Sequence, residues 1–153
     1  PKHATCLSTR IFDLMHTDIV GPFPPSLGGR KYFLTIVDNH SRYGYVFPMK
    51  EKSETFQTFK DSATLVYNQH KVNIARIQSD RGCEFMSQQF QNWMRKNGIL
   101  HQTSAPCTPA QNSVAERHNG VLQTMMQCLL DDANLSFGYW GKAIRAANQP
   151  VSQ

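Results

Sequence analysis

Three acidic residues, Asp18, Asp80 and Glu116, stand in three separate segments of the chain. If their carboxylates converge in the fold, they form a cage of oxygen atoms, which is the ligand set that hard divalent cations such as Mg²⁺ prefer. Two such ions, roughly 3.5–4 Å apart, can activate a water molecule and stabilise the leaving oxygen of a phosphodiester. The three acids therefore predict an enzyme that cuts and joins nucleic acid strands.

Each acid also has an ordinary structural interpretation. Asp18 lies in an apolar run, where a buried carboxylate without a metal or a hydrogen-bond partner would be costly. Asp80 could instead be a turn residue, and Glu116 could complement the dipole of a helix in its first turn. Asp38, a fourth acid, is expected to start the turn that follows a strand.

The composition limits the class of protein. The chain has 153 residues, enough for one domain, and its net charge of +5 suits a polyanionic partner. No run of 18 apolar residues is present, so no membrane span is expected. The four cysteines form no Cys-x-x-Cys pair, which favours reduced thiols in an intracellular protein over a zinc site.

The apolar pattern predicts strands and helices in alternation. Runs rich in β-branched and aromatic residues predict five strands, over residues 14–20, 32–37, 43–48, 74–78 and 99–103. The first three, joined by turn residues, can form an antiparallel meander. Residues 104–110 contain two prolines and are expected to form a flexible loop.

Four helices are predicted between and after these strands. Ser53, Ser87 and Ser136 are expected to cap three of them, and Gly98 to end the second. The long third helix is expected over residues 113–130. Its predicted buried stripe is Val114, Val121, Met125 and Leu129, with Leu122 alongside. The order β-β-β-α-β-α-β-α-α predicts an α/β fold.

The contexts of the three acids resemble the integrase catalytic core of copia-type LTR retrotransposons, within the retroviral integrase superfamily. The resemblance covers nearly the whole chain. The matching segments are His16-Thr17-Asp18 with Gly21-Pro22, Lys31 to Asp38, Ser41-Arg42-Tyr43, Lys50 to Glu54, Ala105 to Pro109, Gln111-Asn112 and Val114 to Asn119. Glu84 also fits, because the family commonly has an acid there, outside the metal-binding triad.

The resemblance implies a ribonuclease H-like fold, an α/β architecture with a five-stranded mixed sheet flanked by helices. In that fold the first and fourth strands are neighbours, which would bring Asp18 and Asp80 together, with Glu116 arriving from the long helix. Residues 1–11 would be an irregular lead-in from a preceding zinc-binding region, and residues 12–150 the catalytic core.

The resemblance also implies a reaction, namely 3′-end processing and DNA strand transfer by metal-dependent polynucleotidyl transfer. Asp18 would bridge two Mg²⁺ ions, Asp80 would bind one of them and Glu116 the other, and Mn²⁺ could replace Mg²⁺. The partners would be the LTR ends of the element and its target DNA. The working enzyme would be a homo-oligomer that acts in the nucleus, without a membrane.

The resemblance implies that polar residues around Glu116 hold the element's DNA end, and arginine side chains and helix N-termini do contact phosphate readily. These candidates are Gln111, Asn112, Arg117, His118 and Asn119. Their alternative interpretation is a solvated helix face, which is the favoured interpretation for Lys142 and Arg145. Three positions, Ser113, Cys107 and Gly120, depart from the residues usual in the family, and Gly120 removes a basic group from the DNA-facing side.

Two other hypotheses stay open. A related ribonuclease H-like nuclease would cleave without joining strands, and the triad alone does not separate it from an integrase. A decayed copy would bind DNA or a partner without catalysis, although the three intact acids argue against this.

Overall fold

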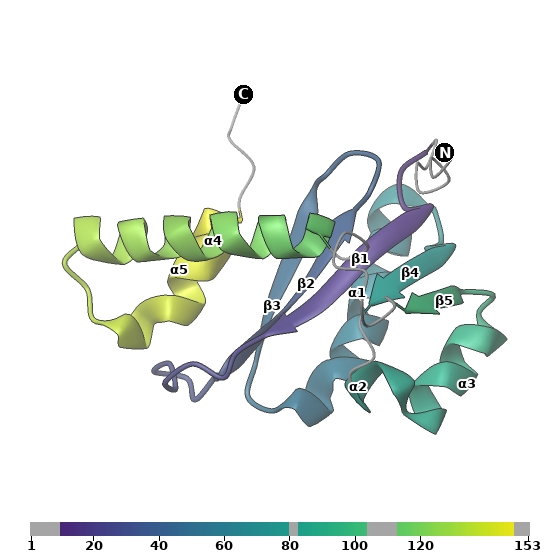
Figure 1. Ribbon diagram of the computed structural model, residues 1–153, viewed down its shortest axis with the longest axis horizontal. Helices are drawn as coiled ribbons and strands as arrows, with labels where there is room; N and C mark the ends of the chain where they lie inside the picture. The colour runs from purple at the N-terminus through teal and green to yellow at the C-terminus, as the bar shows by residue number, and fades with distance from the viewer. Residues whose placement is uncertain (1–9, 80–82, 104–112, 149–153) are drawn as a thin grey trace.

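The computed structural model describes residues 10–79, 83–103 and 113–148. Five strands form one sheet in the order β3-β2-β1-β4-β5. Their bounds are β1 Leu14–Val20, β2 Tyr32–Asp38, β3 Gly44–Met49, β4 Arg76–Ser79 and β5 Leu100–Thr103. Helices lie on both faces of this sheet (Figure 1). The predicted α/β architecture with a five-stranded sheet is therefore confirmed.

The pairing of the strands is mixed. β1, β2 and β3 form the predicted antiparallel meander, with Asp18 opposite Thr35. β4 lies beside β1 and parallel to it, with His16 opposite Gln78, and β5 continues in parallel. The adjacency of the first and fourth strands, which the resemblance implied, is thus present. The fourth strand begins at Arg76 and runs to Ser79, later at both ends than the sequence predicted.

Two apolar layers cover the sheet. On one face, Leu34 and Ile36 of β2 pack with α1 (Thr55–His70) and α3 (Gln88–Lys96). On the other face, Phe33 packs with α4 (Ser113–Asp132) and α5 (Trp140–Ala147). Side chains of a strand alternate between faces, so β2 divides its apolar residues between the two layers. Among the described residues, no helix has the length and apolarity needed to cross a membrane.

The buried face of α4 differs from the prediction. Val121, Met125 and Leu129 are exposed, at 53%, 43% and 40%. The buried row is offset by one residue and consists of Ala115, Asn119, Leu122, Met126 and Leu130. Both rows repeat at intervals of three or four residues, so periodicity alone did not separate them. The row that packs on the sheet begins with the small Ala115 and the polar Asn119. The exposed row includes Arg117, one turn before Val121.

The ends of the helices confirm two of the four predicted signals. Ser87 caps α3, because its hydroxyl accepts a hydrogen bond from the backbone amide of Phe90 at 3.2 Å. Gly98 follows the end of α3 with a φ of 71°, the conformation that glycine adopts without steric cost. A short helix not predicted from the sequence, α2 (Cys83–Met86), precedes α3.

The other two caps were predicted wrongly. Ser53 lies inside a 3₁₀ turn, η2 (Lys52–Glu54), and α1 starts only at Thr55. The carboxylate of Glu54 accepts hydrogen bonds from the amides of Lys50 and Glu51, so an acid organises this helix start instead of a hydroxyl. Ser136 also precedes a 3₁₀ turn, η4 (Phe137–Tyr139), and its hydroxyl makes no capping hydrogen bond.

The turn between β2 and β3 is organised by Asp38, as predicted. Its carboxylate is fully buried and accepts hydrogen bonds from the amide of Phe12 at 2.8 Å and from the amide and hydroxyl of Ser41 at 3.0 and 2.7 Å. These local donors satisfy the charge, so Asp38 has a structural role in the turn.

A close contact joins β3 to α4. The imidazole of His118 lies directly over Gly44, in the space that a β-carbon at position 44 would occupy. Asn148, just after α5, completes the contact, since its amide donates to the carbonyl of Gly44 at 2.8 Å and its Oδ1 lies 3.2 Å from Nε2 of His118. The absence of a side chain at position 44 therefore lets the two helices seat on the edge strand.

We expect the substitution Gly44→Ala to lower the free energy of unfolding by about 1–3 kcal/mol, because the added methyl group overpacks the contact with His118. Urea unfolding followed by circular dichroism measures the change. The double variant Gly44→Ala/His118→Ala should recover part of the loss.

Gly120→Ala is the matched control for this prediction. Gly120 lies inside α4, and apart from its chain neighbours and the adjacent backbone of the helix no atom lies within 4 Å of the place that an added β-carbon would take, so alanine should stabilise the protein by about 1 kcal/mol. Equal destabilisation at both glycines would contradict the proposed role of the contact between Gly44 and His118.

Candidate active site

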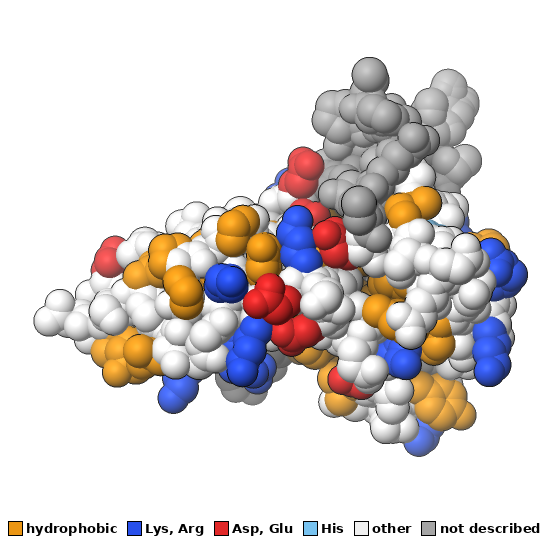
Figure 2. Space-filling view, turned by 90° about the horizontal axis from the view of Figure 1, so that it is seen from below, with side chains coloured by type: hydrophobic (Ala, Val, Ile, Leu, Met, Phe, Trp, Pro, Cys, Tyr) orange, Lys and Arg blue, Asp and Glu red, His pale blue; other side chains and the backbone are white. Residues whose placement is uncertain are grey.

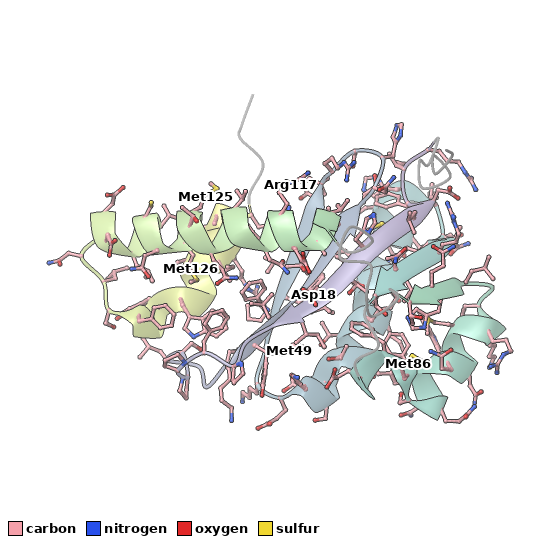
Figure 3. The ribbon with its side chains drawn as sticks, viewed as in Figure 1. Asp18, Met49, Met86, Arg117, Met125 and Met126 are labelled. Carbon is pink, nitrogen blue, oxygen red and sulfur yellow. The ribbon has the colours of Figure 1, made fainter. Side chains whose placement is uncertain are left out.

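Asp18 lies on the central strand β1 and faces the layer that contains α4 (Figure 3). Its side chain is half-buried, and Oδ1 accepts a hydrogen bond from the amide of Ile19 at 3.0 Å. Across the sheet, the hydroxyl of Thr35 lies 3.5 Å from the carbonyl oxygen of Asp18. The backbone on both sides of the carboxylate is thus held by β2.

Asn119 connects this carboxylate to α4. The amide nitrogen of its side chain donates to Oδ2 of Asp18 at 3.1 Å, although the two residues are far apart in sequence. Asn119 is buried, with 4% of its surface exposed, and its Oδ1 has no hydrogen-bond partner among the described residues. Leaving a buried amide oxygen unpaired costs free energy, so the Asn119 side chain holds Asp18 with its nitrogen while its oxygen lowers the stability of the fold.

Glu116 lies one turn before Asn119 on α4 and is exposed. Residues three apart are neighbours on a helix surface, so the contact between Asn119 and Asp18 brings the turn that carries Glu116 onto β1. Asp80, the third predicted acid, lies outside the described residues. Within the described part of the chain, no three His, Cys, Asp or Glu side chains gather closely enough to hold a metal ion.

The strand that leads to position 80 is fastened at its end. The hydroxyl of Ser79 lies 2.6 Å from Nε2 of His101 on β5, and Nδ1 of His101 lies 2.8 Å from Nε2 of Gln91 on α3. Because the Gln91 amide nitrogen can only donate, Nδ1 accepts, and Nε2 carries the proton that it donates to Ser79. Burial lowers the pKa of His101, which keeps the neutral ring that this pattern requires.

The chain is also held after position 82. Glu84 on α2 forms an ion pair with Lys52 of η2 at 3.8 Å, and the next residue, Phe85, is buried. Gln91 donates from its side-chain nitrogen to the carbonyl of Phe85 as well, at 2.8 Å. Glu84, which the resemblance set outside the metal-binding triad, thus contacts a lysine of the neighbouring turn. The residues before and after the segment 80–82 are both fixed to the body of the fold.

His16, two residues before Asp18, is buried in the same strand. Its Nε2 lies 2.8 Å from Oδ1 of Asn39, in the turn after β2. Burial lowers the pKa of His16, more than the hydrogen bond with Asn39 raises it, and the nearby Arg42 lowers it further. His16 therefore fixes β1 to the turn between β2 and β3.

The predicted DNA-binding residues divide into three groups. Arg117, near the start of α4 (Figure 3), is exposed and lines a surface pocket with Val37 of β2 and Arg42. His118 and Asn119 are turned inward, toward Gly44 and Asp18 respectively. Gln111 and Asn112 lie outside the described residues. Burial lowers the pKa of His118, and the hydrogen bond with Asn148 opposes this effect.

Sequence reasoning missed the residues that hold the acids in position. Asn119 was predicted to contact DNA. It lies three residues after Glu116, and this spacing puts it on the same side of the helix. That spacing was the available signal for a contact with the strand of Asp18. His101 and Gln91 gave no signal, because their contact joins two elements whose relative position depends on the whole sheet.

We expect His101 to make folding depend on pH. A histidine whose pKa is lowered in the folded state binds protons more readily when unfolded, so stability is lost as pH falls below about 6.5. The substitution His101→Gln should reduce the slope of unfolding free energy between pH 7 and pH 5, measured by urea titration. The exposed His70, changed to Gln, is the control; an equal reduction in both variants would contradict this assignment.

Comparison with known proteins supports the predicted family. Residues 8–109 match the family model described as Integrase core domain. Over 138 residues, covering 90% of the chain, the sequence is 36% identical to a retrovirus-related Pol polyprotein from transposon TNT 1-94 of Nicotiana tabacum. It is 30% identical over 146 residues to the Pol polyprotein from transposon RE2 of Arabidopsis thaliana, covering 95% of the chain. The chain spans about a tenth of the length of these relatives.

Solved structures agree on the fold. The simian T-cell lymphotropic virus intasome, in complex with a regulatory subunit of PP2A, superposes with a TM-score of 0.71 at 22% identity, covering 88% of this chain and 46% of that one. The HTLV-2 integrase catalytic core, in complex with magnesium, gives a TM-score of 0.66 at 24% identity, covering 88% and 81%. The sheet and its helices thus form a ribonuclease H-like fold, and the chain belongs to the integrase core domain family.

Proposed function

We propose that this chain is a catalytic core for metal-dependent polynucleotidyl transfer, which processes 3′ ends of retrotransposon DNA and joins them to target DNA. The observation that carries the proposal is the hydrogen bond between Asn119 and Asp18, which holds the helix turn of Glu116 against the strand of Asp18. A structural role alone would not require an exposed acid, Glu116, on the helix turn that this bond holds against the strand of Asp18.

The donor set fits a hard divalent cation. Carboxylate oxygens are its preferred ligands, and all three proposed ligands are carboxylates. In the proposal, Asp18, Asp80 and Glu116 hold two Mg²⁺ ions, and Mn²⁺ can substitute. Such ions supply an activated oxygen nucleophile and stabilise the charge on the leaving oxygen.

The remaining residues of the site keep these ligands in place. Asn119 orients the carboxylate of Asp18 by fixing Oδ2. His101 fixes Ser79, the residue to which Asp80 is bonded, and the pair of Lys52 and Glu84 fixes the chain beyond it. Ligands placed on a rigid scaffold reduce the ordering needed at the moment of reaction.

The DNA end would meet the same end of α4. Arg117 supplies an exposed cation one residue from Glu116, suited to a phosphate. Gln111 and Asn112 are proposed to contact DNA from the preceding segment. In this proposal His118 and Asn119 contribute indirectly, by seating the helix turn on Gly44 and Asp18.

Assembly and place of action extend the proposal. One similar structure is an intasome, and the HTLV-2 core was solved in dimeric and trimeric forms. By analogy we propose that this core works as a homo-oligomer with DNA, in the nucleus, where the target DNA lies.

The proposal is tested with a branched DNA that mimics the product of integration, incubated with the protein and Mn²⁺ or Mg²⁺. We expect metal-dependent resolution and rejoining of strands. Asp18→Asn and Glu116→Gln should each lower the rate at least about 100-fold, and Asn119→Ala by a smaller factor, because it misplaces a ligand without removing one. Circular dichroism checks that each variant is folded.

The outcomes separate the competing functions. Cleavage without rejoining would favour a ribonuclease H-like nuclease. A folded protein that binds DNA and metal but rejoins nothing would favour a decayed, non-catalytic copy. Full activity in Asp18→Asn would overturn the site assignment.

Gly120 offers a gain-of-function test on the same helix. Position 120 is exposed and has free space around it. Gly120→Lys should tighten binding to duplex DNA and steepen its dependence on log salt concentration by about 0.9, the contribution of one additional phosphate contact. Fluorescence anisotropy of a labelled duplex measures both quantities.

Gly120→Ala separates this charge effect from helix stabilisation. Alanine supplies a similar gain in helix propensity without a cation. If both variants bound DNA equally, this face of α4 would not lie against the DNA backbone.

A further inference from the structure

A second cationic site lies away from the carboxylates, where the loop over residues 21–31 meets α5. A pocket of about 290 Å³ opens there, and three basic residues line it, Arg30 from the loop and Lys142 and Arg145 from α5. Tyr139 and Ser26 contribute to its wall. Lys and Arg side chains reach the surface at this end of the molecule (Figure 2).

The loop that forms one wall is fastened to the other wall. The amide of Leu27 donates to the carbonyl of Gly138 at 2.8 Å, and the indole nitrogen of Trp140 donates to the carbonyl of Pro24 at 2.9 Å. Within the loop, the amide of Arg30 donates to the hydroxyl of Ser26 at 3.1 Å. Because these bonds fix the loop to η4 and α5, the backbone positions of the three cations are held near one another before any ligand arrives.

No acid in the described residues neutralises these cations. The ion pairs of the described chain involve Arg10, Lys31, Lys52 and Arg76, and no acidic side chain lines the pocket. Three like charges on one pocket repel each other, which costs free energy in the absence of an anion. Three glycines in the lining, Gly28, Gly138 and Gly141, add no side chains that would obstruct access to it.

We propose that this pocket binds backbone phosphates of duplex DNA, as an anchoring site separate from the carboxylate site. The inference rests on the proposed function and adds a second DNA contact to it. The basic residues are suited to phosphate oxygens, and Arg30 and Arg145 can bind them in a bidentate manner.

The distance between the pocket and the carboxylate site is one that a single duplex can cover. Glu116 lies in the first turn of α4, whereas α5 packs along the part of α4 that contains Leu122, Met126 and Leu130. With a rise of 1.5 Å per helical residue, the two sites are separated by on the order of 20 Å. A duplex that leaves the carboxylate site would cover that distance in about six base pairs.

The test compares two triple variants of equal charge. Arg30→Ala/Lys142→Ala/Arg145→Ala removes the pocket cations. Lys60→Ala/Arg95→Ala/Lys96→Ala removes three cations from α1 and α3, on the opposite face of the sheet. Binding of a labelled duplex of about 20 base pairs is followed by anisotropy over a salt series, with EDTA present so that no metal-dependent chemistry occurs.

We expect the pocket variant to weaken DNA binding at least tenfold and to reduce the salt slope by about two to three, since each lost phosphate contact removes about 0.9. The control variant should reduce the slope by less than about one. If both variants weakened DNA binding and lowered the salt slope equally, the pocket cations would act only through the overall charge, and the proposal would be overturned. The single charge reversal Arg145→Glu should weaken binding further than Arg145→Ala, which keeps the proposal testable if a triple variant folds poorly.

Two additional arms separate the alternatives. Inorganic phosphate, titrated calorimetrically at constant ionic strength, should bind only weakly; tight binding of phosphate without a pocket effect on the duplex would assign the site to a free anion and overturn the proposal. The rejoining assay with Asp18→Asn tests the catalytic proposal independently. If the chain rejoined no DNA but the two triple variants still differed in DNA binding, the proposed function would be wrong and the assignment of the pocket to DNA would stand.

Discussion

The hydrogen bond from Asn119 to Asp18 is the contact on which the arrangement of this site depends. It joins the central strand to the long helix at the level of two acids, and it does so with a neutral amide. A lysine in place of Asn119 would neutralise Asp18 and compete with any cation. An amide orients the carboxylate without bringing an opposite charge to it.

Other contacts of the fold hold α4 in the same position on the sheet. Phe33 and Trp140 fill the space between sheet and helices, and the indole nitrogen of Trp140 also holds the loop before β2. His118 seats the first turns of α4 on Gly44. Because α4 is fixed at its start by polar contacts and further along by Leu122, Met126 and Leu130, it has little freedom to rotate and displace Glu116.

The features that could be predicted from the sequence are those that depend on residues close together in the chain. Continuous β-branched runs indicated the strands, Ser87 and Gly98 marked the ends of α3, and Asp38 marked a turn. Predictions were wrong where two local solutions competed. Val121 and Leu122 belong to equally apolar rows, and the sheet decided between them; Arg117, which heads the exposed row, was the available signal. At Ser53 a nearby glutamate took over the role expected of the hydroxyl.

The position of Asp18 along β1 has a consequence for its rigidity. Among the described residues, pairing between β1 and β4 is present from Leu14 to His16, whereas pairing with β2 continues to Val20. The backbone that carries Asp18 is therefore paired with β2, with Thr35 opposite the acid and two further pairs beyond it. Because this pairing continues past the acid in both directions along the strand, β1 does not fray at Asp18, and the carboxylate keeps its position when it meets a large, charged substrate.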